Sequence, residues 1–371
     1  MFFINNTLNR LAIAASFIFI SLSLIAEPTL EEVVVSARKV DENLQDVPIA
    51  MSVFTSSDIE DAGIQRPEDF IALTPNVVMA NTVNVGDTLV TIRGLTSTRD
   101  AESNFAFVVD GVLQTNPNAF NRELLDIAQI EVLKGPQGAL YGRNATSGAI
   151  LITTKAPSEE SQSTAVVGMG VNNSTKLQFV NSGKMGENVY TRFSVSTRDT
   201  DGEHTNVFSN SNNVDHFEDT TIRTRFLVDN GDSSWDLRAG ISEASGGTIN
   251  FNAVFALPAF QGFGTPGADQ FYKDVNTHQF TYMFNVPPVN EQETADISLK
   301  YTEDMGDGRE FSAILAYNHL EEFLLSDGTS GAFGGYFGVP SCAASNTASN
   351  LALINSLPPG FSFAAPGTAP S

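Results

Sequence analysis

The alternation of hydrophobic and polar positions changes character near residue 155. Before it, short β-branched runs are separated by glycines, and each run is strand-length and ends on a residue that can turn the chain. The runs are Val90–Gly94, Ala106–Val112, Ile130–Gly138, Tyr141–Arg143 and Gly148–Lys155. Residues 84 to 155 are therefore predicted to form a small mixed sheet with tight, glycine-dependent corners.

A strand and two short helices are predicted ahead of this sheet. Residues 47–54 are extended in pattern, and Ser57-Asp58 can cap a short helix that runs to Ala62 and ends at Gly63. A second helix is predicted from Pro67 to Leu73, because proline suits a first helical turn. Together these segments predict an α+β domain.

After Lys155 the chain falls into segments that alternate with period two. Trp235, Leu237, Ala239 and Ile241 share one face, and Asp236, Arg238, Gly240 and Ser242 share the other. One apolar and one wet face suit either a membrane barrel or a half-buried soluble sheet. Strands are predicted near 163–172, 175–183, 188–199, 219–229, 233–243, 293–303 and 309–324.

Connection lengths favour the barrel. After the first hairpin, short links (184–187, 230–232, 304–308) alternate with long ones (200–218, 244–292), as in bacterial barrels with short periplasmic turns and long outer loops. About seven strands are predicted, whereas plugged transporters close with about 22. The expectation is an incomplete antiparallel transmembrane β-barrel, the N-terminal part of a longer product, in which Cys342 has its partner in the missing portion.

Composition narrows the function. The 371 residues carry 20 basic and 43 acidic side chains, a formal charge of −23, which argues against a nucleic-acid partner. One cysteine and four widely spaced histidines predict neither a disulfide framework nor a metal site. No nucleophile with its base and no carboxylate pair stands out, so an enzyme is disfavoured and no cofactor is expected.

The N-terminus resembles an export signal. Arg10 precedes an uncharged run from Leu11 to Ala26, which is short for a membrane-spanning helix and ends on a small residue. Residues 1–26 are predicted to be a cleaved signal peptide, with an uncleaved anchor as the alternative. The mature chain would then begin near Glu27.

Five motifs, in order, resemble the plug domain of TonB-dependent outer-membrane receptors. They are Ile92-Arg93-Gly94, Val109-Asp110-Gly111, the run from Glu131 to Gln137, the run from Leu140 to Asn144, and Gly148-Ala149-Ile150. The resemblance divides the chain into a TonB box and linker (27–43), a plug (44–155), a linker (156–162) and the start of the barrel (163–371).

The resemblance also implies roles for particular residues. Glu32, Val33, Val34, Val35, Ser36 and Ala37 would form the TonB box, which pairs with TonB; the alternative is that they are simply the plug's first strand. Arg93 and Arg143 would pair with carboxylates of the barrel wall, with Glu131 a candidate partner inside the plug; alternatively, both arginines are solvated surface charges.

The same resemblance implies roles for two further sets of residues. Thr96, Ser97, Arg99, Gln114 and Asn116 lie in loops that would touch ligand at the plug apices, or they are ordinary loop residues. Six glycines are expected as corners that need positive φ or close backbone approach: Gly94, Gly111, Gly135, Gly138, Gly142 and Gly148.

The implied function is active uptake across the outer membrane of a Gram-negative bacterium. The partners would be TonB with its energising complex, outer-membrane lipid and a scarce ligand. A ferric siderophore is the default ligand, while cobalamin, haem, oligosaccharides and aromatic compounds use the same plug. The alternative from another class is a secreted β-rich adhesion or binding protein, which would be soluble without detergent.

Overall fold

The computed structural model describes residues 33–40, 42–81, 86–98, 101–206, 210, 214–247 and 288–325. The chain divides into two units, Met1–Pro48 and Ile49–Ser371. The predicted signal peptide, Glu32, Arg99 and Cys342 lie outside the described residues.

The first unit contains a short hairpin. Strand β1 (Val34–Val35) pairs antiparallel with β2 (Glu42–Asn43), and a 3-10 helix, η1 (Leu44–Asp46), follows. The connection is closed by a hydrogen bond from Lys39 N to Ser36 O at 2.8 Å and by an ion pair between Arg38 and Glu42 at 3.1 Å. The segment predicted as a TonB box is therefore partly paired with its own chain.

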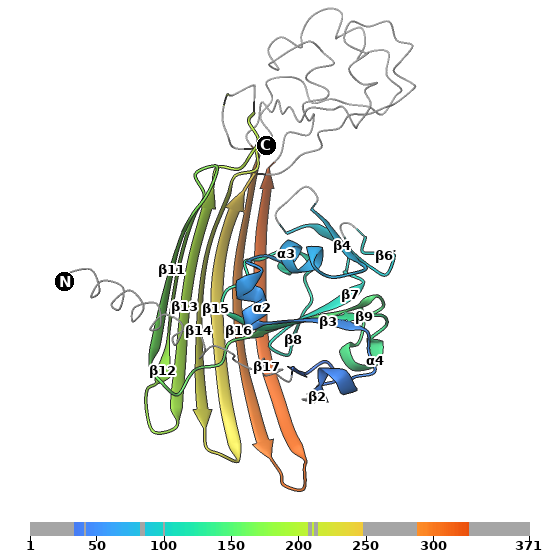
Figure 1. Cartoon of the computed structure of the whole chain (residues 1–371), viewed down its shortest axis with the longest axis vertical. Helices are drawn as coiled ribbons and strands as arrows, with labels where there is room; N and C mark the ends of the chain where they lie inside the picture. Colours follow the sequence, from blue (N-terminus) through green and yellow to red (C-terminus); the bar gives the residue numbers. More distant parts are fainter. Residues whose placement is uncertain are drawn as a thin grey trace, which may run out of the picture. The chain divides into compact units, whose positions relative to one another are not determined.

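The second unit begins with a mixed sheet in the order β3-β9-β10-β7-β8. Only β10 and β7 are parallel, so the predicted small mixed sheet is confirmed. A smaller sheet has the order β4-β5-β6 (Figure 1). The strands are β3 (Met51–Thr55), β4 (Val77–Asn81), β5 (Thr88–Ile92), β6 (Leu95–Thr96), β7 (Phe105–Val109), β8 (Val112–Gln114), β9 (Ile127–Lys134) and β10 (Gly148–Thr154). We call residues 49–155 the plug region.

Short helices connect these strands. They are α2 (Ser56–Asp61), α3 (Pro67–Ala72), η2 (Pro117–Ala119) and α4 (Gly138–Tyr141). The start of α2 differs by two residues from the prediction: Thr55 is the N-cap and forms a capping box with Asp58, while Ser57 lies inside the helix. Helix α3 begins at Pro67 as predicted.

Two sequence motifs form tight hairpins for the same reason. Arg93-Gly94 connects β5 to β6 with φ of 51° and 82°, and Asp110-Gly111 connects β7 to β8 with φ of 50° and 84°. Positive φ at both central residues is the signature of two-residue type I′ turns, whose twist matches that of the flanking strands.

Four more glycines were predicted to form corners, and they differ in backbone conformation and surroundings. Gly135 and Gly142 have φ of 114° and 76°, and a Cβ on Gly148 would lie 2.2 Å from Leu133 O. Gly138 differs from the expectation: it has neither a positive φ nor any atom within 4 Å of its Cβ position. It lies instead at the first position of α4, where an ordinary helical φ is needed.

The plug region encloses an apolar core. Phe120 lies at its centre, with ring centroids 6.5 Å from Phe70 and 5.1 Å from both Phe105 and Phe107. All three pairs are edge-to-face, the arrangement that aromatic quadrupoles favour. Residues of α2, α3, β4, β5, β7, β9 and β10 belong to the same cluster.

The second sheet has seven strands in sequence order, every neighbouring pair antiparallel (Figure 1). They are β11 (Gln162–Met169), β12 (Thr175–Lys184), β13 (Val189–Thr200), β14 (Phe217–Asp229), β15 (Ser233–Gly246), β16 (Val289–Asp304) and β17 (Glu310–Leu325). This wall sheet confirms the seven predicted strands. Among the described residues it is open, with β11 and β17 at its edges.

The two faces of the wall sheet differ as the alternation predicted. On β15, Trp235 and Ile241 are 45% and 58% exposed, whereas Asp236 between them is 6% exposed. Beside the short turns, the Trp235 ring lies 4.6 Å from that of Tyr301, which lies 6.4 Å from that of Phe311. On β15, one face is therefore apolar and exposed, and the other is polar and covered.

Candidate functional site

The polar face of the wall sheet meets the plug region along a seam of charged groups. The seam encloses a cavity of about 90 Å³ whose lining includes five arginines and three aspartates. Because it joins the plug region to the wall sheet through charged groups, the seam is the candidate functional site.

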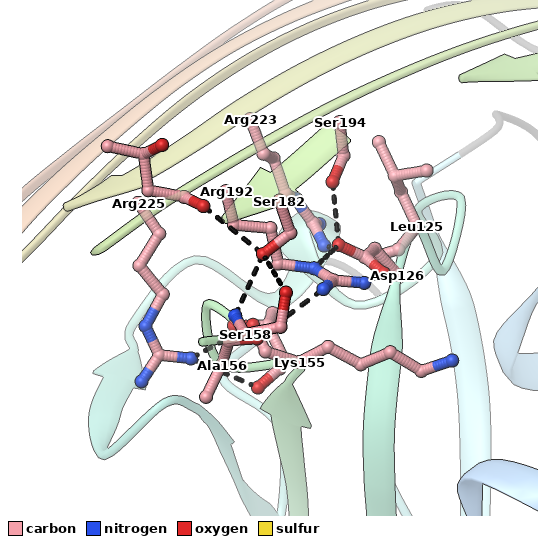
Figure 2. A network of polar contacts seen from close by, with 12 residues as sticks. Leu125, Asp126, Lys155, Ala156, Ser158, Ser182, Arg192, Ser194, Arg223 and Arg225 are labelled. Atoms are coloured by element: carbon pink, nitrogen blue, oxygen red, sulfur yellow. Dashed lines mark hydrogen bonds and ion pairs between the residues drawn. The ribbon is translucent and has the colours of Figure 1, made fainter. Parts of the chain in front are cut away.

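The pair of Asp126 and Arg192 lies at the centre of the seam (Figure 2). The Arg192 guanidinium donates through Nε and Nη2 to the two carboxylate oxygens of Asp126, the second at 2.7 Å. Ser194 Oγ donates to the same carboxylate at 2.6 Å. Burial raises the pKa of Asp126, but the guanidinium and the hydroxyl more than offset this and hold the pKa below its usual value. Asp126 is therefore a buried, ionised anchor.

Arg192 belongs to a row of three arginines in register. Arg192, Arg225 and Arg238 lie directly opposite one another on β13, β14 and β15. Like charges at directly opposite positions destabilise a sheet. The wall supplies one carboxylate in partial compensation, because Asp236 accepts from Arg225 at 2.8 and 3.0 Å and from Arg238 at 2.6 Å.

The plug region supplies the remaining compensation. Arg225 donates to Thr154 O at 3.2 Å and to Lys155 O at 3.1 Å, and Arg238 donates to Asp110 O at 2.9 Å. The Asp110 carboxylate lies 3.7 Å from Arg238 and accepts from Thr154 N at 2.9 Å. Asp110 thus both closes the β7–β8 hairpin and faces the arginine row.

A second charged contact lies nearer the long connections. Glu123, only 1% exposed, is 3.3 Å from Lys176 and 3.5 Å from Arg198. Arg122 donates to Asp296 at 2.9 Å. Asn118 donates to Glu322 at 2.6 Å and accepts on its carbonyl from Gln292 at 3.3 Å.

One short segment makes most of these contacts. Residues 118–126 contact β12 through Lys176, β13 through Arg192, Ser194 and Arg198, β14 through Arg223, β16 through Gln292 and Asp296, and β17 through Glu322. We call residues 118–126 the fastening segment. It joins the plug region to five of the seven wall strands.

The polarity of the seam differs from that predicted. Plug arginines were expected to meet wall carboxylates, and Arg122 with Asp296 does so. In the other four ion pairs across the seam, wall cations meet plug carboxylates. The sequence held a signal for these wall cations. Arg192, Arg225 and Arg238 lie on the polar side of alternating strands, where a buried cation needs a partner.

Arg93, Arg143 and Glu131, which were predicted to form plug ion pairs, have neighbours within the plug region. Arg143 pairs with Glu102 at 3.1 Å, both exposed and both in the plug region. Arg93 lies beside Gly135 and Lys134; burial and the Arg93 charge lower the pKa of Lys134. Glu131 is buried on β9 and accepts from Gln129 at 3.1 Å; burial and the Glu131 charge raise the pKa of Tyr141 to about 12. The roles of Arg93, Arg143 and Glu131 toward the wall stay predictions.

The predicted apical residues have local partners. Thr96 contacts Thr91 at 2.9 Å, and buried Ser97 bonds to both backbone groups of Val90. Asn116 accepts from Asn118 N at 3.0 Å, and Gln114 accepts from Asn318 of the wall at 3.0 Å. Ligand binding by these residues stays a prediction.

Within the described ranges, no group of three or more His, Cys, Asp or Glu side chains is placed to hold a metal ion. None of the helices described is long and apolar enough to cross a membrane.

Comparison with known proteins agrees with the geometry. Residues 43–149 match the model of the TonB-dependent Receptor Plug Domain. The pesticin receptor of Yersinia enterocolitica is 24% identical over 213 residues, which are 57% of this chain and 31% of that protein. The vitamin B12 transporter BtuB of Vibrio vulnificus is 32% identical over 169 residues, 42% of this chain and 27% of that protein.

Solved structures agree on the fold. The ferric yersiniabactin uptake receptor FyuA of Yersinia pestis has a TM-score of 0.64 at 19% identity, covering 75% of this chain and 42% of that one. The siderophore receptor PiuA of Acinetobacter baumannii has the same TM-score at 17% identity, covering 79% of this chain and 39% of that one. The chain spans about a third of the length of the curated relatives it matches. Residues 43–149 therefore match the plug domain of TonB-dependent receptors, and about half of the chain is similar in sequence to curated receptors of this kind.

Proposed function

We propose that this chain acts in an outer-membrane receptor that takes up a scarce ligand, most simply a ferric siderophore or a similar iron complex, with energy supplied through TonB. The observation that carries the proposal is the seam. A plug with its own apolar core is held on the polar face of a strand wall by ion pairs and hydrogen bonds, which can be exchanged one at a time.

The outer face of the wall supports a membrane location. On β15, nine residues lead from Trp235 to Glu243, with apolar side chains at the exposed positions between them. A membrane-spanning strand needs about 9–11 residues when tilted. The ring contacts of Trp235, Tyr301 and Phe311 stand at the short-turn end, where barrel girdles place aromatic residues.

The N-terminal hairpin supports a role for the TonB box. Strand β1 is paired over only two residues, Val34 and Val35, with Asn43 and Glu42. So short a pairing is readily exchanged for a strand from another protein. In this proposal Glu32 to Ala37 pair with TonB, residues 1–26 direct export, and ligand binds at the apices near Thr96 and Gln114.

Deletion of residues 32–37 tests the box directly. Cells that carry the receptor with this deletion are expected to bind the radiolabelled iron complex at the surface but not to accumulate it. Uptake that persists at the original rate would contradict the assignment. N-terminal sequencing of the mature protein tests the export signal, with a start near Glu27 expected.

Cobalamin is a second candidate ligand, favoured by the similarity to the vitamin B12 transporter BtuB. Growth of a gene-deletion strain separates the two ligands. A defect corrected by excess free iron supports an iron complex, whereas a defect corrected only by excess vitamin B12 supports cobalamin. Normal growth of the deletion strain, both when iron is limiting and when vitamin B12 is limiting, would contradict both candidate ligands.

A further inference from the structure

The arginine row has a property that the closed plug hides. Of the carboxylates that face Arg192, Arg225 and Arg238, Asp236 belongs to the wall, while Asp126 and Asp110 belong to the plug. Three of the remaining acceptors are plug backbone carbonyls, those of Asp110, Thr154 and Lys155. Most of the row's compensation therefore leaves if the plug moves away from the wall.

With the plug moved away from the wall, the arginine row would carry a net positive charge. The row keeps three guanidinium groups against the single carboxylate of Asp236. The neighbouring row holds Arg223 and Asp296, with Gly240 between them, and their opposite charges offset one another. The three arginines of the row line the cavity of about 90 Å³. They would therefore also line any path that opens along this part of the seam.

We propose that Arg192, Arg225 and Arg238 form an anion-binding site on the wall that receives cargo carrying carboxylate or phosphate groups while the plug is displaced. This inference rests on the proposed uptake function and names the chemical class of its cargo. The anionic groups of the cargo take the places of Asp126, Asp110 and the plug carbonyls.

The chemistry of arginine supports this class of cargo. A guanidinium presents paired donors that match the two oxygens of a carboxylate or phosphate, as Arg192 already does with Asp126. Three such groups in register on adjacent strands repel one another when uncompensated. An anion of two or more charges relieves that repulsion, whereas a neutral ligand does not.

The site can be tested without knowing the natural ligand. The receptor that carries this chain is inserted in a planar lipid bilayer, and a denaturant on one side unfolds the plug reversibly. The reversal potential in a KCl gradient reports the permeability of chloride relative to potassium. Pyrophosphate, a compact multivalent anion, is then added as a blocker.

We expect Arg225→Gln to lower the chloride-to-potassium permeability ratio several-fold and to weaken pyrophosphate block by about tenfold, the loss of one charge-assisted contact. Arg225→Lys keeps the charge and should retain selectivity while losing part of the block, because lysine lacks the paired donors. Arg309→Gln, in the exposed turn 305–309, is the matched control and should behave as wild type.

Wild-type selectivity and block in Arg225→Gln would overturn the proposal, and so would a receptor that conducts no ions when its plug unfolds. Neither result bears on uptake itself, which the gene-deletion growth test measures separately. Conversely, anion selectivity that depends on Arg225 in the bilayer would support the site. If the gene-deletion strain then showed no uptake defect, the proposed function would be refuted while the site stood.

Discussion

The plug interior and the plug-to-wall seam are held by different forces. Phe120 belongs to the interior, whereas Arg122, two residues further on, belongs to the seam. The interior packs aromatic and aliphatic side chains around Phe120. The seam uses ion pairs and hydrogen bonds, most of them from the fastening segment. Apolar cohesion is lost all at once, whereas polar contacts can be exchanged singly for water or ligand. The contrast suits a plug that must move relative to its wall.

The largest expected effect is in the interior. Phe120→Ala removes a ring that is 2% exposed and should destabilise the plug by about 3–5 kcal/mol. Chemical unfolding followed by proteolysis of the plug measures this change. Val78→Ala, at a position 62% exposed on β4, is the control, and equal effects of the two substitutions would refute the assignment of the core.

The next effect is in the seam. Asp126→Asn leaves the Arg192 guanidinium buried without its carboxylate, and it should weaken attachment of the plug by about 3 kcal/mol while leaving the interior intact. Protease cleavage within residues 156–161, which join β10 to β11, should rise sharply in the variant. Unchanged cleavage would mean that this pair does not hold the plug.

The same pair predicts a pH dependence. The pKa of Asp126 is lowered in the folded protein, so its contribution is present above the unfolded pKa of about 4 and is lost as pH falls through the lower folded value. Cleavage of the wild-type linker by an acid-stable protease should therefore rise below about pH 4. The part of this rise due to Asp126 should be absent in Asp126→Asn; identical pH profiles would contradict the assignment.

A steric change should open the seam more mildly. A Cβ on Gly86 would lie 2.6 Å from Gln292 Nε2 of the wall and 2.9 Å from Asn118 O of the plug, so in Gly86→Ala the Gln292 side chain and the backbone near Asn118 must both move. A cost of about 1–3 kcal/mol is expected, measured by hydrogen exchange in residues 114–120. Gly138→Ala, where a Cβ has no neighbour within 4 Å and φ is not positive, is the control without crowding. Unchanged protection in Gly86→Ala would exclude the close approach.

The smallest effect is expected at Arg143. Its pair with Glu102 is exposed on both sides, at 67% and 51%, and such pairs contribute less than about 1 kcal/mol. Arg143→Gln should leave the unfolding midpoint of the plug almost unchanged. A large loss of plug attachment in this variant would instead support the predicted contact between Arg143 and a wall carboxylate.

Local features were predictable because their causes lie within a few residues. Period-two alternation placed β13 at 188–199, and the structure has Val189–Thr200. It also assigned Asp236 and Trp235 to opposite faces. The helix cap was misplaced because Thr55 and Ser57 are both competent caps, and only the formed capping box with Asp58 distinguishes them.

The wall strands, the faces of those strands and the glycine turns of the plug follow from local patterns, because periodicity and backbone sterics act over short distances. The partners across the seam depend on three-dimensional packing. Asp126 meets Arg192, 66 residues away, and Arg122 meets Asp296, 174 residues away. The pattern of a strand shows that Arg192 faces inward, but the carboxylate it meets depends on how the plug docks.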